Sequence, residues 1–167
     1  MNAFWSYFWP PFCAGLVVAV IAGAIGFPRP RRKRNIAFAI GTFLSIGLAV
    51  LWHGPLGAAD RFVADVNQSI RAAVVYNYIP EVSGHVQRGP LTRHVLLSGP
   101  ADDFQRSQLV EIIGDLPGVE SASWSGDGKG IPLIIEGGIA AVLGFLCGLV
   151  LAYLRELRRR YNANWNW

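Results

Sequence analysis

Three long apolar stretches dominate the pattern of hydrophobic and polar positions along the chain. They cover residues 11–27, 36–52 and 131–154, and contain 17, 17 and 24 residues. About 20 apolar residues cross a bilayer as a helix, and roughly 17 is the lower limit. The pattern therefore predicts an integral membrane protein with three transmembrane helices, of which the first two are short.

The polar segment between the second and third stretches, residues 54–130, has the periodicity of a small folded domain. Asp60 is a candidate helix N-cap, and Phe62 and Val66 begin a run of apolar residues at helical spacing. Pro80 ends this helix, because proline interrupts helical hydrogen bonding. Two strands, a second helix and a third strand follow, which gives the order αββαβ. The expected boundaries are residues 82–88 and 94–98 for the first two strands, Asp102 or Asp103 as the cap of a helix that reaches Leu116, residues 119–124 for the third strand, and 126–130 for a glycine-rich linker.

Short structural motifs lie along residues 60–124. They are His94-Val95-Leu96-Leu97-Ser98-Gly99, Ala101-Asp102-Asp103, the helix through Ile113, and Leu116-Pro117-Gly118-Val119. In this order they resemble the BON domain, a small α/β module of bacterial envelope proteins. The resemblance implies binding to phospholipid, to envelope surfaces or to other proteins, and it brings no catalytic residues. The chain departs from the family in the longer connection 89–93, which places Leu91 and Arg93 at a loop tip.

Basic residues are concentrated in two short segments beside the apolar stretches. Residues 28–35 and 155–167 hold nine of the 15 basic residues, whereas residues 54–130 hold six basic and nine acidic ones. Short loops rich in Lys and Arg stay in the cytoplasm. We therefore expect a bacterial inner (cytoplasmic) membrane protein whose N-terminus and residues 54–130 are periplasmic and whose C-terminus is cytoplasmic. The residues that set this topology are Arg29, Arg31, Arg32, Lys33, Arg34, Arg158, Arg159 and Arg160.

The predicted fold class is an α+β membrane protein, with three transmembrane helices and a small αββαβ BON-like exported domain between the second and the third. The basic segments favour contact with anionic lipid headgroups. Nucleic acid is not an expected partner, because its recognition requires a larger basic surface on a folded domain.

Small residues recur four positions apart within each span, so they share one helix face and allow close approach of another backbone. Two interpretations remain open: the three spans pack on one another, or the faces contact other subunits. The helix-packing candidates are Gly15, Ala19, Gly23, Ala37, Gly41, Ser45, Ala140, Gly144 and Gly148.

Aromatic residues mark the ends of the spans, where amphipathic rings favour the membrane interface. Residues 1–10 are expected to form an outer interfacial segment, with 4–9 as a short amphipathic helix. Pro10 and Pro11 then occupy the first turn of the first span. Residues 155–167 form a basic and aromatic tail. The interfacial anchor candidates are Trp5, Trp9, Trp52, Trp165 and Trp167.

Few residues suggest chemistry. Glu136 is a carboxylate near the start of the third span, where an interfacial or inter-helix hydrogen bond competes with proton or ion transfer as its role. His53 at the end of the second span is a candidate haem or pigment ligand, although no second ligand supports it. His85 and His94 are candidates to meet across a hairpin and bind metal. No nucleophile motif is present, so we expect no enzymatic activity, no cofactor and no metal.

These features predict a non-enzymatic accessory or scaffold subunit of a larger membrane complex, of the respiratory or photosynthetic type. Helix faces and the exported domain would contact other membrane-protein subunits. The alternatives are an autonomous envelope factor whose domain binds phospholipid or envelope proteins, and an oligomeric channel.

Overall fold

The computed structural model describes residues 2–126 and 130–163, and the chain divides into a helical unit and an α+β unit. The helical unit comprises Phe8–Leu56 and Gly137–Trp167, and the α+β unit comprises Met1–Tyr7 and Gly57–Glu136. The anchor candidates Trp165 and Trp167, like residues 127–129 of the expected linker, lie outside the described residues.

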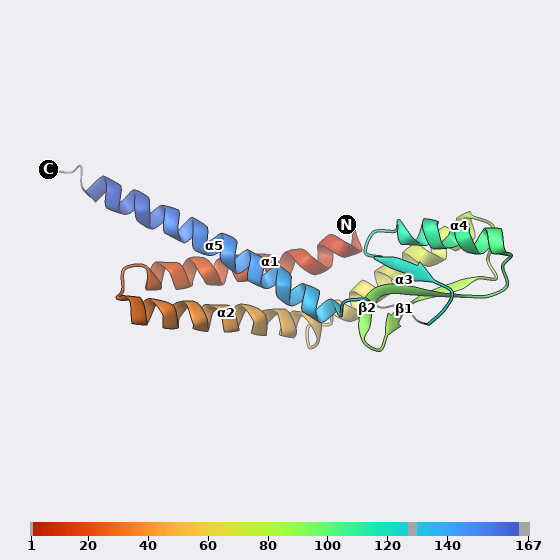
Figure 1. Cartoon of the computed structure of the whole chain (residues 1–167), viewed down its shortest axis with the longest axis horizontal. Coiled ribbons are helices and arrows are strands. Elements are labelled where there is room, and N and C mark those ends of the chain that lie inside the picture. Colours follow the sequence, from red (N-terminus) through yellow and green to blue (C-terminus); the bar gives the residue numbers. More distant parts are fainter. Residues whose placement is uncertain (1, 127–129, 164–167) are drawn as a thin grey trace. The chain divides into compact units, whose positions relative to one another are not determined.

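Three helices of the described chain are long and apolar enough to cross a membrane (Figure 1): α1 (Ala3–Gly26), α2 (Arg31–His53) and α5 (Leu133–Ala163). The protein is thus a membrane protein with an additional α+β part. Both α2 and α5 extend beyond the apolar stretches into arginine-rich sequence. Arginine is a good helix former, and its long side chain can reach polar surroundings from a helix end.

Helix α1 corrects the prediction for the N-terminus. It begins at Ala3 and runs through Pro10 and Pro11, so residues 4–9 are not a separate helix and the prolines are not in a first turn. Proline has a helix-compatible φ, and membrane helices tolerate it where neighbouring groups satisfy the freed carbonyls. One buried face accounts for the continuity. It comprises Ala3, Tyr7, Pro11, Gly15 and Ala19, each four residues after the last.

Within the helical unit, small residues bring α1 and α5 into backbone contact. A side chain at Gly15 would meet the backbone of Ala141, and one at Gly144 would meet the backbone of Phe12. Ala141, which is buried, lies at this contact in place of the predicted Ala140, which is half-buried. Phe145 fills the space beside α2, where it lies against Gly41. These contacts lie within one chain.

The remaining predicted packing positions lie along the same bundle. Ala19 and Ala22 form a buried cluster with Phe145. Gly23 approaches Ala152, and Gly148 approaches Leu16 and Ala19. On α2, Ser45 is buried and donates its hydroxyl to the Gly41 carbonyl at 2.9 Å, whereas Ala37 is half-buried.

The α+β unit contains helices α3 (Ala58–Tyr76) and α4 (Asp103–Gly114) and strands β1 (Ser83–Arg88), β2 (Leu91–Ser98) and β3 (Ser121–Ser123). The sheet order is β1-β2-β3, with β1 antiparallel and β3 parallel to β2. Both helices cover one face of the sheet, and Phe62, Ile70 and Ile113 are fully buried beneath them with Val86 and Val95.

Several boundaries in this unit differ from the sequence prediction: α3 ends at Tyr76, before Pro80, α4 ends at Gly114, and β3 spans only Ser121–Ser123. Two further differences move predicted residues. Helix α3 begins at Ala58 after Gly57, whose φ of 69° is readily adopted only by glycine, so Asp60 lies in the first turn and is not the cap. The hairpin closes tightly on Gly89-Pro90, because Arg88 pairs with Leu91. Leu91 and Arg93 therefore lie in β2 and not at a loop tip.

The cap of α4 is confirmed as Asp102. Its carboxylate accepts from the Gln105 backbone N–H at 2.7 Å, and the Gln105 side chain accepts from the Asp102 N–H at 3.1 Å. This reciprocal capping box satisfies two N–H groups at the helix start and is typically worth about 1 kcal/mol.

Candidate interaction sites

Arg93 and Glu136 form an ion pair between strand β2 and the first turn of α5. The guanidinium donates from Nε to Glu136 Oε2 at 2.7 Å and from Nη2 to Oε1 at 3.2 Å. Both side chains are largely buried, with exposed fractions of 18% and 13%. Glu120 lies 3.8 Å from the same guanidinium, and the Phe4 ring centre lies 5.6 Å from its Cζ. We call Arg93, Glu136, Glu120 and Phe4 the Arg93 clasp.

Tyr7 adds a second connection at the same end of the α+β unit. Its hydroxyl donates to the Leu133 carbonyl at 3.4 Å, and its ring packs edge-on against Phe62 at 5.6 Å between centroids. The first turns of α1 and α5 are thus built into the α+β unit. Phe4 and Tyr7 were expected to lie in an interfacial segment, and the structure places both within this unit.

The clasp resolves the open question on the contacts of Glu136. The expected hydrogen bond of Glu136 is present, but its partner is an arginine of strand β2 and not a residue of another helix. A bidentate pair with arginine is among the stronger side-chain interactions and fixes the carboxylate in place. The ion pair therefore accounts for the position of Glu136, and proton or ion transfer stays an untested alternative.

His94 is a buried polar residue of strand β2, with 3% of its surface exposed. Its Nδ1 lies 2.8 Å from Ser121 Oγ, and its Nε2 lies 2.9 Å from Ser123 Oγ. Ser123 donates its own proton to the Ser125 carbonyl at 2.6 Å. Because the only proton of the Ser123 hydroxyl is used in that bond, its oxygen must accept a hydrogen bond from His94 Nε2–H. The neutral imidazole ring therefore carries its proton on Nε2. The side chain joins β2 to β3.

The two histidines considered as a metal pair do not meet. His85 pairs with Leu96 across the hairpin and is exposed, whereas both ring nitrogens of His94 are engaged by serines. In the described part of the chain, no three His, Cys, Asp or Glu side chains are grouped as a metal site requires. His53 is the half-buried last residue of α2, and ligation of haem or pigment by it stays a prediction.

Large apolar side chains are exposed where α3 ends. Val75, Tyr76 and Tyr78 are 66%, 83% and 92% exposed. Tyr78 has a φ of 59°, which non-glycine residues rarely adopt. Backbone bonds hold this turn, since Tyr78 N–H donates to the Val75 carbonyl and Ile79 N–H to that of Val74, at 3.1 and 3.2 Å. The turn therefore presents the Tyr78 ring from an ordered backbone.

A shallow groove of about 600 Å³ adjoins these residues, between α3 and α4. We call Val75, Tyr76, Tyr78 and this groove the Tyr76 surface. The groove is lined by Ser69, Ala72, Ala73, Tyr76, Asn77, Ile112 and Leu116.

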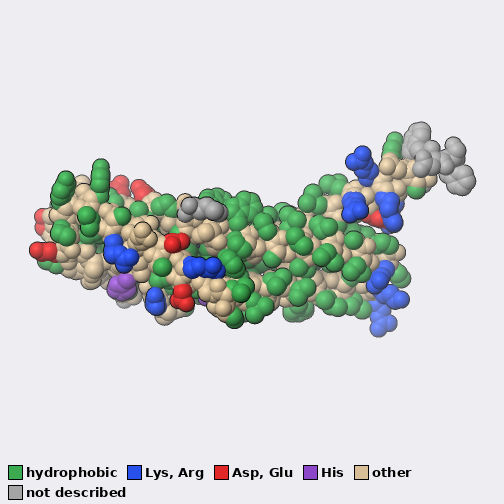
Figure 2. All heavy atoms as spheres, turned by 180° about the vertical axis from the view of Figure 1, so that it is seen from behind, with side chains coloured by type: hydrophobic (Ala, Val, Ile, Leu, Met, Phe, Trp, Pro, Cys, Tyr) green, Lys and Arg blue, Asp and Glu red, His purple; other side chains and the backbone are tan. Residues whose placement is uncertain are grey.

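Acidic residues are close in sequence to the residues of the Tyr76 surface. Asp65 lies four residues before Ser69 on α3, and Asp115 lies three after Ile112, so each stands one turn along the helix from a groove residue. Glu81 follows Tyr78 in the connection to β1. The basic residue nearest in sequence to the groove residues is Arg71, which directly precedes Ala72. Figure 2 shows exposed hydrophobic side chains beside acidic ones on the α+β unit.

Sequence reasoning did not find this surface, although a signal was present. The buried face of α3 includes Phe62, Val66, Ile70 and Val74. Val75 and Tyr76 extend the apolar run beyond that face, so their side chains cannot all be buried by the same contacts. Exposed apolar residues outside the buried stripe are informative when they are large and adjacent.

Comparison with protein-family models, with curated proteins and with solved structures finds no match to this chain. Its class therefore follows from its own features: three helices apolar enough to span a membrane and a small α+β unit.

Proposed function

We propose that this protein is a non-enzymatic accessory subunit of a larger membrane complex, and that the Tyr76 surface contacts another subunit. The observation that carries the proposal is the exposure of Val75, Tyr76 and Tyr78 beside an apolar groove. Tyrosine is enriched among the residues that dominate binding energy at protein interfaces. An ordered turn lowers the entropy cost of binding, because its conformation is already fixed.

The charges around the surface favour a protein partner over a lipid headgroup. Anionic phospholipid attracts basic clusters and repels carboxylates. Asp65, Glu81 and Asp115 are close in sequence to residues of the Tyr76 surface, and residues 54–130 carry nine acidic against six basic residues. A partner with basic side chains around an apolar residue is complementary. These charges disfavour the alternative of an envelope factor that binds phospholipid through the same surface.

A BON-like domain remains part of the proposal. The order α3-β1-β2-α4-β3 and the mixed sheet support it, as do the motifs around His94 and Leu116. The proposed setting is the inner membrane of a bacterium, with the α+β unit in the periplasm, and the positions of the basic residues support this topology.

The proposed topology predicts opposite labelling of two single cysteines. We expect Ser125→Cys, in the α+β unit, to react in intact spheroplasts with a thiol reagent that does not cross membranes. Asn35→Cys, in the basic part of α2, should react only after lysis. Both positions are exposed. A background with Cys13 and Cys147 replaced by serine serves as the blank, and labelling of Asn35→Cys before lysis would overturn the topology.

The partner contact predicts a site-specific loss of assembly. Affinity purification of tagged wild-type protein in mild detergent should recover a second subunit at fixed stoichiometry. Tyr76→Ser should lower that recovery at least tenfold, since interface residues of this kind contribute about 2 kcal/mol or more. Native sizing and mass spectrometry measure both results.

Phe104→Ser is the matched control for that variant. Phe104 is an aromatic residue of the same unit and is 68% exposed, but it does not line the groove. Equal loss from both variants would reject the Tyr76 surface as the contact. A wild-type protein that purifies alone would reject the accessory-subunit proposal itself.

A further inference from the structure

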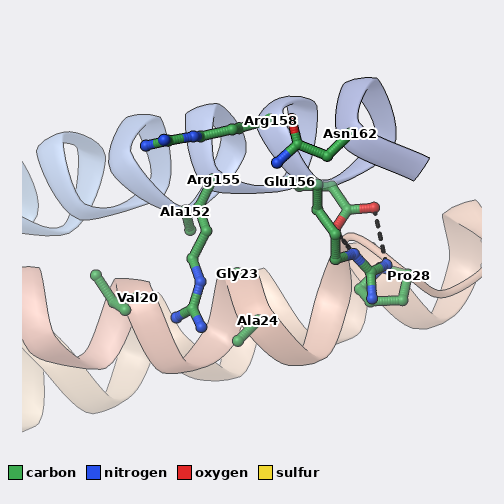
Figure 3. Close-up of a pocket in the computed structure, with 10 residues that line it drawn as sticks. Val20, Gly23, Ala24, Pro28, Ala152, Arg155, Glu156, Arg158 and Asn162 are labelled. Carbon is green, nitrogen blue, oxygen red and sulfur yellow. Dashed lines mark hydrogen bonds and ion pairs between the residues drawn. The ribbon is translucent and has the colours of Figure 1, made fainter. Parts of the chain in front are cut away.

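A cavity lies between α1 and α5 at the arginine-rich end of the helical unit. Its volume is about 430 Å³. Helix α1 lines it with the small apolar residues Val20, Gly23 and Ala24. Helix α5 lines it with Ala152 and with the charged side chains of Arg155, Glu156, Arg158 and Arg159. Figure 3 shows the Arg155 side chain extending from α5 toward α1, on the side where Val20 and Ala24 lie. We call this cavity the α1–α5 wedge.

The helical unit has almost no acidic groups to balance its arginines. Residues 8–56 and 137–167 contain nine basic residues and a single acidic one, Glu156. Figure 2 shows the basic side chains gathered where α1 meets α2 and where α5 ends. The Glu156 carboxylate is already engaged, because Arg159 and Arg160 both donate to it at 2.9 Å. No carboxylate of this unit is left for Arg155 or Arg158.

Arg155 is exposed at the edge of the apolar lining and has no acidic partner in the described part of the chain. Within residues 2–126 and 130–163, the structure gives neither Arg155 nor Arg158 an ion pair or a hydrogen bond. A guanidinium beside hydrocarbon is costly unless it is paired or reaches polar surroundings. Arg155 directly follows the apolar stretch 131–154, so its side chain is at the level where lipid phosphates are expected.

We propose that the α1–α5 wedge binds one anionic glycerophospholipid. Arg155 holds the headgroup phosphate, and Arg158, which also lines the wedge but lies along α5 in Figure 3, adds positive charge to the cavity. Guanidinium groups are well suited to phosphate, since they present several N–H donors in a fixed plane. The apolar wall formed by Val20, Gly23 and Ala24 contacts the start of an acyl chain. Basic pockets between transmembrane helices bind lipid headgroups in this way.

The apolar wall selects lipid over free phosphate as the ligand. A phosphate ion would occupy only the arginine side and leave Val20 and Ala24 without a partner. A lipid satisfies both walls, because its phosphate and its acyl chain are covalently joined. This inference is independent of the Tyr76 surface, which lies on the α+β unit.

The test is lipid binding to the purified full-length protein in detergent. Native mass spectrometry with added phosphatidylglycerol should show one tightly retained lipid, and phosphatidylcholine should show no such retention. Arg155→Gln should weaken phosphatidylglycerol binding about fivefold, since one basic residue near anionic lipid contributes about 1 kcal/mol. Arg31→Gln is the matched control, because Arg31 is basic and exposed but does not line the wedge.

A second variant tests the apolar wall while all arginines are retained. Ala24→Leu places a larger side chain in the wedge, and it should also reduce retention of phosphatidylglycerol. Equal weakening by Arg31→Gln and Arg155→Gln would overturn the site in favour of diffuse surface attraction. Competition by inorganic phosphate at the same concentration as the lipid would overturn the lipid assignment. Unchanged binding in both wedge variants would overturn the proposal entirely.

Discussion

Gly144→Leu should separate α1 from α5 and lower the stability of the helical unit by about 3 kcal/mol. A Cβ atom at this position meets the backbone carbonyl of Phe12, and backbone cannot move aside as a flexible side chain can. Overpacking commonly costs 1–3 kcal/mol, and backbone contact places this substitution at the upper end. The expected shift in the thermal midpoint is roughly 6–12 °C, measured as the monodisperse fraction that remains after heating in mild detergent.

Gly138→Leu provides the control for this result. Gly138 lies on the same helix, but nothing lies within 4 Å of a Cβ built there. The α+β unit should stay folded in both variants, which a cysteine at the fully buried Val95 reports through its protection from thiol reagents. Similar midpoint shifts for Gly144→Leu and Gly138→Leu would show that the α1–α5 contact does not limit stability.

Arg93→Met should destabilise the α+β unit by about 2–3 kcal/mol. It removes the bidentate partner of Glu136 and leaves a largely buried carboxylate without a donor. Breaking one side of a buried pair costs more than the pair contributes, because the remaining charge is uncompensated. Some solvent reaches both groups, which keeps the expected value below that of a fully buried pair. The loss of stability is measured by unfolding the full chain in denaturant, with the reactivity of the thiol in a Val95→Cys background as the signal.

The double variant Arg93→Met/Glu136→Leu isolates the interaction energy of this pair from the contacts that each residue makes with other groups. We expect it to be more stable than the sum of the two single variants implies, with a coupling of about 1–2 kcal/mol. Arg88→Met is the control, since Arg88 is an exposed arginine of strand β1. Strict additivity of the two single variants would mean that the Arg93–Glu136 pair contributes no coupling energy to stability.

Periodicity and local turn signals predicted much of this fold. The spacing of Phe62, Val66 and Ile70 predicted α3, and the acidic pair before Phe104 predicted the cap of α4, because these features depend on residues within one or two turns. The lengths of the apolar stretches predicted three candidate spans. Such signals are local, so one sequence is enough to read them.

The clasp could not be predicted in the same way. Glu136 was a candidate because a carboxylate near the start of an apolar helix is unusual, but its partner depends on the register of β2. Sequence placed Arg93 at a loop tip, and only the tight turn at Gly89-Pro90 brings it into the strand. Tyr7 and Leu133 are 126 residues apart, and no local pattern links them. An aromatic residue beside a transmembrane span is usually interpreted as an interfacial anchor. That interpretation did not predict the contact of Tyr7 with the α+β unit.

The contribution of both α1 and α5 to the α+β unit sets the order in which the chain can finish folding during synthesis. Tyr7 leaves the ribosome first, and Leu133 follows 126 residues later. At about 5–20 residues per second, the interval is roughly 6–25 s. During this interval the Phe62 ring lacks its contact with Tyr7 unless Tyr7 has already packed against it. Arg93 lacks the Glu136 carboxylate in any case, because Glu136 has not yet been synthesised. The nascent domain can be completed only when the third apolar helix begins to emerge, so membrane insertion of α5 and closure of the clasp fall within the same stage of biosynthesis.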